Sequence, residues 1–197
     1  MTYITNILFF ISTGLLIPVI ILLLVSFIWS LVSLGELYGH FIFRLRHRKL
    51  RAELEHNLKK NGVKVIKDSE LFRKESGFSE YATQMIEADF SKVHCEKILN
   101  DFQAESERRS GTSTILARTA PMLGLMGTLI PMGPALTGLA SGDISSMATN
   151  MQVAFATTVV GIFTGGAGYL VNLLKKRWDN EDYDLLEYIY ELSGSDR

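Results

Sequence analysis

The residues of this chain that could do chemistry are threonines set in two long uncharged stretches. These stretches run over residues 119–142 and 144–174, and both are rich in glycine, alanine and threonine. The candidate hydroxyls are those of Thr128, Thr157, Thr158 and Thr164. Hydroxyl oxygens on adjacent helices suit a hard cation or an ordered water. The alternative, which stays open, is that each hydroxyl bonds to a carbonyl one turn back in its own helix.

Proline adds a second source of oxygen ligands to the first of these stretches. Pro131 and Pro134 each lack the amide hydrogen that a helix uses, so they free carbonyls near Gly127 and Ile130. Inside a membrane such a carbonyl needs a partner from protein, a hydroxyl or water. Thr128 lies beside these carbonyls and strengthens the expectation of an ion-lining helix.

Ionisable groups are almost absent from the same region. Between Arg118 and Lys175 the only charged side chain is Asp143, which falls between the two stretches. A proton relay or ion pump ordinarily needs a titratable group at membrane depth. Either the chain is a passive packing protein, or the missing carboxylate comes from another polypeptide.

Enzyme chemistry and bound cofactors are not expected. The sequence contains no nucleophile and base pair, phosphate-binding loop or metal-ligand spacing. Cys95 is the only cysteine, so no intrachain disulfide and no cysteine-based metal site is expected.

Three transmembrane helices follow from the distribution of hydrophobic residues. Charged residues make up 21% of the chain and mean hydropathy is +0.17, so polar and apolar segments must be segregated. About 20 apolar residues span a hydrocarbon core, and we expect spans near residues 7–34, 115–140 and 148–174. The fold class is therefore an all-α membrane protein with helical extensions into the cytoplasm.

Basic residues cluster at one end of each span and set the topology. The anchoring residues are Arg44, Arg46, Arg48, Lys175, Lys176 and Arg177. The loop over residues 141–148 carries no basic residue, so the positive-inside rule predicts an outside N-terminus and a cytoplasmic middle segment and C-terminus. Beside a membrane helix such a basic cluster favours anionic lipid over nucleic acid, and no nucleic-acid partner is expected.

The organisation along the chain is predicted as follows. Residues 1–39 hold the first span, 40–112 a cytoplasmic helical segment, 113–175 a core of two spans, and 176–197 a cytoplasmic C-terminal helix. Within the middle segment, apolar residues at a helical period from Tyr81 to Ile98 predict one helix. We expect a break at Asn61 and a loop or bent link over residues 62–79. The helix over 178–192 is expected to pack on the middle segment.

Small residues form a stripe on each of the last two spans. They are Gly124, Gly127, Pro131 and Ala135 on the second span, and Ala154, Gly161, Gly165 and Gly168 on the third. Helices in lipid associate through close backbone approach, which such stripes permit. They predict helix packing, and together they favour an oligomer or a partner-bound assembly over a monomer.

Two segments resemble a known family. Residues 118–127, R-T-A-P-M-L-G-L-M-G, followed by Thr128, resemble the A-P-x-L-G-L-x-G-T signature of the MotA/TolQ/ExbB proton-channel family. Residues 154–163, A-F-A-T-T-V-V-G-I-F, are similar to its A-L-x-A-T-x-x-G-L-F segment. The three-span layout resembles the TolQ/ExbB branch. The resemblance implies an inner-membrane homo-pentamer around single-span partners of the ExbD/TolR/MotB type, whose membrane aspartate carries the ion.

The resemblance also assigns roles and shows departures. Thr128 and Thr158 match the family threonines that line the path beside the partner's aspartate. Val153 stands where TolQ and ExbB proteins have a glutamate, and Pro131 interrupts the usual G-T-x-x-G continuation. The adjacent Thr157 and Thr158 resemble the double threonine of sodium-driven flagellar stators, so the transported ion is H⁺ or Na⁺.

Two functions from different classes remain open at this point. The first is a subunit of an ion-driven motor, which turns ion flow into mechanical work with the partner chain. The second is a structural membrane scaffold that oligomerises through the same glycine faces and conducts nothing.

Overall fold

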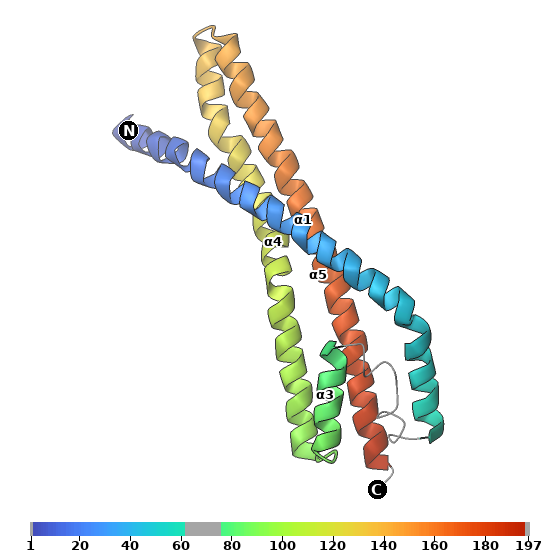
Figure 1. Cartoon of the computed structure of the whole chain (residues 1–197). Coiled ribbons are helices and arrows are strands. Elements are labelled where there is room, and N and C mark those ends of the chain that lie inside the picture. Colours follow the sequence, from blue (N-terminus) through green and yellow to red (C-terminus); the bar gives the residue numbers. More distant parts are fainter. Residues whose placement is uncertain (1, 62–75, 196–197) are drawn as a thin grey trace. The chain divides into compact units, whose positions relative to one another are not determined.

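The computed structural model describes residues 2–61 and 76–195, and these form helices (Figure 1). The helices are α1 (Thr2–Asn61), α3 (Ser76–Glu87), α4 (Lys92–Ala140) and α5 (Ile144–Ser195). The described ranges contain no strand, so the predicted all-α class is confirmed for them. Most of the link predicted over 62–79 lies outside the described residues, and its last four residues open α3.

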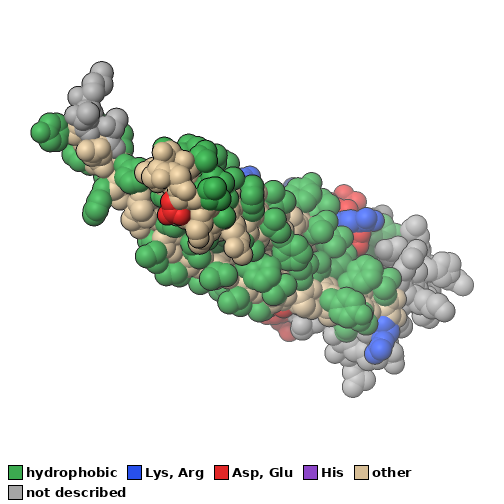
Figure 2. Space-filling model, turned by 90° about the horizontal axis from the view of Figure 1, so that it is seen from above, with side chains coloured by type: hydrophobic (Ala, Val, Ile, Leu, Met, Phe, Trp, Pro, Cys, Tyr) green, Lys and Arg blue, Asp and Glu red, His purple; other side chains and the backbone are tan. Residues whose placement is uncertain are grey.

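Three of these helices can cross a membrane. Within the described residues α1, α4 and α5 are each long and apolar enough to do so, which confirms the prediction of a multi-pass membrane protein. Large apolar side chains of α1 point outward, as Phe10 does with 81% of its surface exposed. Figure 2 shows a face largely covered by hydrophobic side chains. Such a surface needs lipid or protein to cover it.

The chain divides into two compact units. The span unit comprises Met1–Gly35 and Thr112–Asn172, and the polar unit comprises Glu36–Gly111 and Leu173–Arg197. Each of the three long helices contributes one segment to each unit.

Close contact between α4 and α5 holds the span unit together. A Cβ added at Gly161 would lie 2.7 Å from Gly124 Cα and 2.9 Å from Ala120 O, both of them backbone atoms. A Cβ at Gly127 would lie 2.6 Å from Thr157 Cβ. The two helices therefore approach until backbone meets backbone, which only glycine allows.

The same contact continues toward the other end of the pair. Gly165 lies against the Pro121 ring, and a Cβ at Gly168 would lie 2.9 Å from Ala117 N. As the residue number rises on α5 it falls on α4, so the helices are antiparallel partners in one continuous register. The short turn between them, in which Gly142 adopts φ 76°, permits this arrangement.

α1 adds a third element to the span unit. Its buried residues Val19, Leu23, Ser30 and Ser33 recur at steps of three, four or seven, which places them on one helix face. Phe27 meets Phe163 of α5 with ring centroids 5.8 Å apart. The remaining faces of this segment are left for lipid or for other protein.

The polar unit corrects one sequence prediction. The single helix expected from Tyr81 to Ile98 is wrong, because the chain turns between Glu87 and Lys92. Asp89 and Phe90 adopt left-handed φ values of 47° and 52° there. The turn folds α3 back beside α4, as Figure 1 shows. A helical period that happens to continue across a turn misled the prediction.

Folding α3 back creates the apolar core of the polar unit. The buried members of this core are Phe78, Ala82, Met85, Cys95, Ile98, Leu99, Phe102, Leu185, Leu186 and Ile189. Tyr81 meets Phe102 edge-on at 5.2 Å between centroids. The α5 residues in this core confirm that the C-terminal helix packs on the middle segment. Burial raises the pKa of the Cys95 thiol, which keeps it protonated and unreactive.

The α4–α5 contact predicts that Gly161→Ala is destabilising. The added methyl would press on the Gly124 and Ala120 backbone, and overpacking of this kind costs about 1–3 kcal/mol. Thermal unfolding of the detergent-purified chain measures the effect.

Gly166→Ala is the matched control, because nothing lies within 4 Å of the position that its Cβ would take. We expect its melting temperature to stay at or slightly above that of the parent. Equal destabilisation by the two changes would contradict the close contact.

Candidate functional site

Three of the four candidate threonines donate hydrogen bonds inside their own helices. Thr128 Oγ1 donates to Leu125 O at 2.7 Å. Thr157 Oγ1 lies 2.9 Å from Ala154 O and 3.0 Å from Val153 O, and Thr158 Oγ1 donates to Ala154 O at 3.1 Å. This is the alternative left open from the sequence. It does not remove the hydroxyls as ligands, because a hydroxyl that donates its proton keeps its acceptor lone pairs.

Burial divides the four threonines into two pairs. Thr128 and Thr158 are partly exposed, so a second polypeptide can reach them. Thr157 is 6% exposed and Thr164 is fully buried. The second pair therefore lies inside the helix packing of the chain itself, and the four hydroxyls do not share one surface.

Thr164 differs from the others in its hydrogen bonding. Its Oγ1 has no hydrogen-bond partner among the described residues. Gly165, the next residue along α5, has Ala117 O 3.6 Å from the position of an added Cβ. Pro121 has no amide hydrogen to offer this carbonyl. The buried α4–α5 contact thus includes polar groups without their usual helical partners.

The predicted packing residues are all buried within the chain. They are Gly124, Gly127, Pro131, Ala135, Ala154, Gly161, Gly165 and Gly168. The five glycines meet atoms of the opposite helix of the α4–α5 pair. Their small size therefore serves contact within one subunit, while a role against a partner chain stays a prediction.

No carboxylate lies within the α4–α5 contact of the span unit. The one acid between Arg118 and Lys175, Asp143, accepts a hydrogen bond from Ser146 N at 2.9 Å. It thereby caps the first turn of α5. The described residues also contain no cluster of His, Cys, Asp and Glu that could hold a metal ion.

One polar contact in the span unit was missed from the sequence. Thr114 Oγ1 donates to Asn172 Oδ1 at 3.2 Å and links α4 to α5. An asparagine near the end of an apolar stretch, such as Asn172, indicates a polar contact with another helix. That Thr114 is its partner is known only once the register of α4 against α5 is known.

The basic residues predicted as topology anchors differ in their surroundings. Arg44 is the most enclosed, with hydrogen bonds to Asp182, to Glu181 at 3.3 Å and to Trp178 O at 3.2 Å. Its guanidinium also lies 5.4 Å from the Trp178 ring centroid. Arg44 therefore fastens α1 to α5 within the polar unit.

The other anchors are less enclosed. Lys175 lies 3.8 Å from Glu36, and Arg177 pairs with Glu181 at 3.2 Å. Arg46 and Lys176 are exposed, and the surroundings of Arg48 lie outside the described residues. The acidic partners on α5 were not predicted, because a charge in a sequence does not show which helix faces it.

Three long apolar helices, two of them locked together by glycines, define a multi-pass helical membrane protein. The model of the MotA/TolQ/ExbB proton channel family matches residues 50–185. The match covers more than half of the chain, so the chain belongs to this family, as its two motif segments predicted. Comparisons with curated proteins and with solved structures found no match. The family indicates a channel or motor type of function.

The Arg44 contacts predict that Arg44→Ala destabilises the polar unit. Removing the guanidinium leaves the buried Asp182 without this partner, and a lost charged hydrogen bond costs about 1–3 kcal/mol. Thermal unfolding followed by tryptophan fluorescence measures the change.

Arg46→Ala provides the matched control, since Arg46 is exposed and lies in the same helix. We expect its unfolding temperature to match the parent. If both variants unfold at the parent temperature, Arg44 does not fasten α1 to α5.

Proposed function

We propose that this chain is the channel-forming subunit of an ion-driven motor. In this proposal several copies, five by resemblance to the family, surround a single-span partner of the ExbD/TolR/MotB type in the inner membrane. The N-terminus would lie outside, and the polar unit would lie in the cytoplasm. The ion would pass between the subunit wall and an aspartate of the partner.

The observation that carries the proposal is the pairing of reachable hydroxyls with a missing carboxylate. Thr128 and Thr158 are partly exposed on helices that the family model covers. Apart from Asp143 in the turn, residues 119–174 hold no Asp, Glu, Lys, Arg or His. A helix surface that offers only hydroxyls can orient an ion but has no group that binds and releases it by changing its own charge. In this proposal that group is an acid from a second chain.

The mechanism follows from the charge of that acid. A bound ion would neutralise the partner's aspartate, and its release would restore the charge. Moving one charge across about 100 mV supplies about 2.3 kcal/mol. The Thr128 and Thr158 hydroxyls would contribute acceptor lone pairs beside the aspartate, while each keeps its bond to its own helix.

The choice between H⁺ and Na⁺ depends on oxygen ligands. Na⁺ needs several oxygens, whereas a proton needs only a chain of hydrogen bonds. Thr157 faces Gly127 in the α4–α5 contact and is buried. Its role in the path would therefore be indirect, by holding Thr158 in place. A sodium site would need further oxygens from the partner.

The partner interface in this proposal differs from the glycine stripes. Those stripes are occupied by contact between α4 and α5. Exposed side chains such as Met122, Leu125 and Leu129 on α4 and Val159 on α5 remain to meet other chains. The non-conducting scaffold was expected to assemble through the glycine faces, and their burial weakens that alternative.

Ion flux in vesicles tests the proposal. The chain is reconstituted with its co-purifying single-span partner, and flux is measured under an imposed H⁺ or Na⁺ gradient. We expect Thr158→Val to reduce flux about tenfold or more, because it removes the hydroxyl ligand and keeps the side-chain volume.

Thr137→Val is the control, since Thr137 is exposed on α4 and donates to Gly133 O as an ordinary helix threonine. Its flux should equal that of the parent. Unchanged flux in Thr158→Val, or a stable complex without any single-span chain that bears a membrane acid, would contradict the motor.

A further inference from the structure

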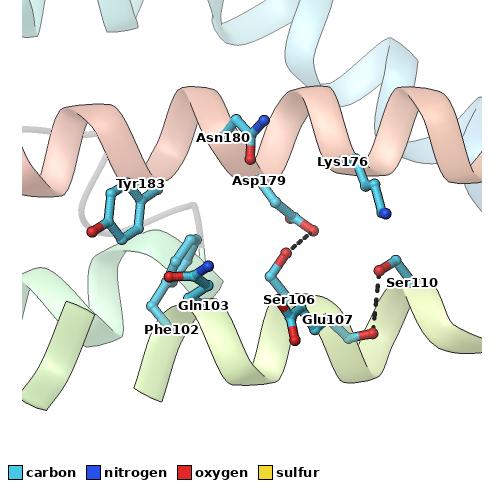
Figure 3. A pocket seen from close by; sticks show the side chains of 9 residues that line it. All are labelled: Phe102, Gln103, Ser106, Glu107, Ser110, Lys176, Asp179, Asn180 and Tyr183. Carbon is cyan, nitrogen blue, oxygen red and sulfur yellow. Dashed lines mark hydrogen bonds between the residues drawn. The ribbon is translucent and has the colours of Figure 1, made fainter. Parts of the chain in front are cut away.

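The polar unit contains a pocket between α4 and α5 (Figure 3). Its volume is about 360 Å³. The lining residues are Phe102, Gln103, Ser106, Glu107 and Ser110 on α4, and Lys176, Asp179, Asn180 and Tyr183 on α5. Hydroxyls, amides and charges of both signs therefore surround one small cavity.

The charges in this pocket are ordered along α5. Lys176 lies beside Ser110 at one end, and Asp179 follows about one turn later, where it accepts a hydrogen bond from Ser106 at 2.5 Å. Glu107 adds a second carboxylate. Within the described part of the chain Lys176 forms no ion pair. One cationic end and one anionic end thus face the same cavity.

The order of Lys176 and Asp179 along α5 can be compared with the order of charges in a lipid headgroup. The third span is predicted to end at Leu174, so at about 1.5 Å per residue Lys176 lies about 3 Å beyond it and Asp179 about 8 Å beyond it. The polar headgroup layer is about 5–8 Å thick on each side of a bilayer. Along α5, leaving the predicted span, Lys176 therefore comes before Asp179, in the same order as the phosphate and the terminal ammonium of a zwitterionic lipid headgroup.

We propose that this pocket binds the headgroup of a phosphoethanolamine lipid. Lys176, with Ser110 beside it, contacts the phosphate, and Asp179 and Glu107 accept hydrogen bonds from the terminal ammonium. The acyl chains stay in the bilayer. Tyr183 and Phe102 line the pocket at the end away from Lys176. The proposal does not depend on ion conduction.

Other ligand classes fit the charges less well. A purely anionic lipid would bring its phosphate to Lys176 but leave the carboxylates without a cation. A free metal cation would pair with the carboxylates but would bring no anion for Lys176. A zwitterion with its phosphate nearer the membrane than its ammonium matches both ends of the pocket.

Native mass spectrometry of the full detergent-purified chain tests this directly. Phosphatidylethanolamine and phosphatidylglycerol are titrated separately, and the occupancy of bound lipid gives each affinity. We expect the parent to prefer phosphatidylethanolamine about tenfold, since each charged hydrogen bond is worth roughly that factor. Lys176→Gln should weaken phosphatidylethanolamine binding about fivefold or more.

The carboxylates should set the preference between the two lipids. Asp179→Asn and Glu107→Gln are each expected to bring the two affinities within about twofold of each other. Glu107→Gln leaves the Ser106 to Asp179 hydrogen bond in place. If circular dichroism shows that Asp179→Asn does not fold, Glu107→Gln alone tests whether the carboxylates set the preference between the two lipids.

Two controls separate the pocket from a general basic or acidic surface. Arg177→Gln removes one positive charge beside Lys176, and Asp184→Asn removes one exposed negative charge on the same helix, and neither residue lines the pocket. Both should keep the parent's ratio of phosphatidylethanolamine affinity to phosphatidylglycerol affinity. Equal loss in Arg177→Gln and Lys176→Gln, or a lipid preference that survives Glu107→Gln, would overturn the proposal.

Discussion

The close approach of α4 and α5 is the constraint on which the rest of the span unit depends. Lipid offers little hydrophobic gain for bringing two helices together, so contact area must come from backbone approach. At Gly124 and Gly161 the backbones of the two helices are in contact, and the absence of a side chain at Gly127 leaves space for the side chain of Thr157. The antiparallel register that results decides which side chains are enclosed and which face outward. It buries Thr157 and Thr164 and leaves Thr128 and Thr158 partly exposed.

In the proposed function, this division between buried and partly exposed hydroxyls would let an uncharged pair of helices take part in ion movement. The glycines fix the positions of α4 and α5 relative to each other, and in the proposal the partly exposed hydroxyls of Thr128 and Thr158 would provide oxygen ligands. Apart from Arg118 and Asp143, the charged residues belong to the polar unit, where Arg44 meets Asp182 and Glu181 and where Lys176 and Asp179 line one pocket. In the proposal, the chain would supply an uncharged surface beside the ion path, and the partner would supply the acid. Membership of the MotA/TolQ/ExbB family agrees with this division of labour.

Much of this structure was predictable, because composition and helical period depend on local sequence. The three spans, the family motifs and the packing of the C-terminal helix on the middle segment all followed from such patterns. What failed or was missed depends on which surfaces meet. The glycine stripes suggested contact between subunits, yet in the structure they pack within one, and a stripe alone does not name its partner. The turn at Asp89 and Phe90 was missed because apolar spacing continues across it. The partners of Arg44 were missed because they lie 137 and 138 residues away in sequence.

The most direct measurement is a disulfide between α4 and α5 of one chain. Thr114 and Asn172 share a hydrogen bond across these helices, so Thr114→Cys and Asn172→Cys are combined in a Cys95→Ser background. A protease site placed in the turn at Gly142 then separates the two halves of each chain. Oxidation in native membranes should keep the halves of a single chain joined after cleavage, with a product of monomer mass. Products joined only between different chains, or no cross-link at all, would contradict the α4–α5 contact.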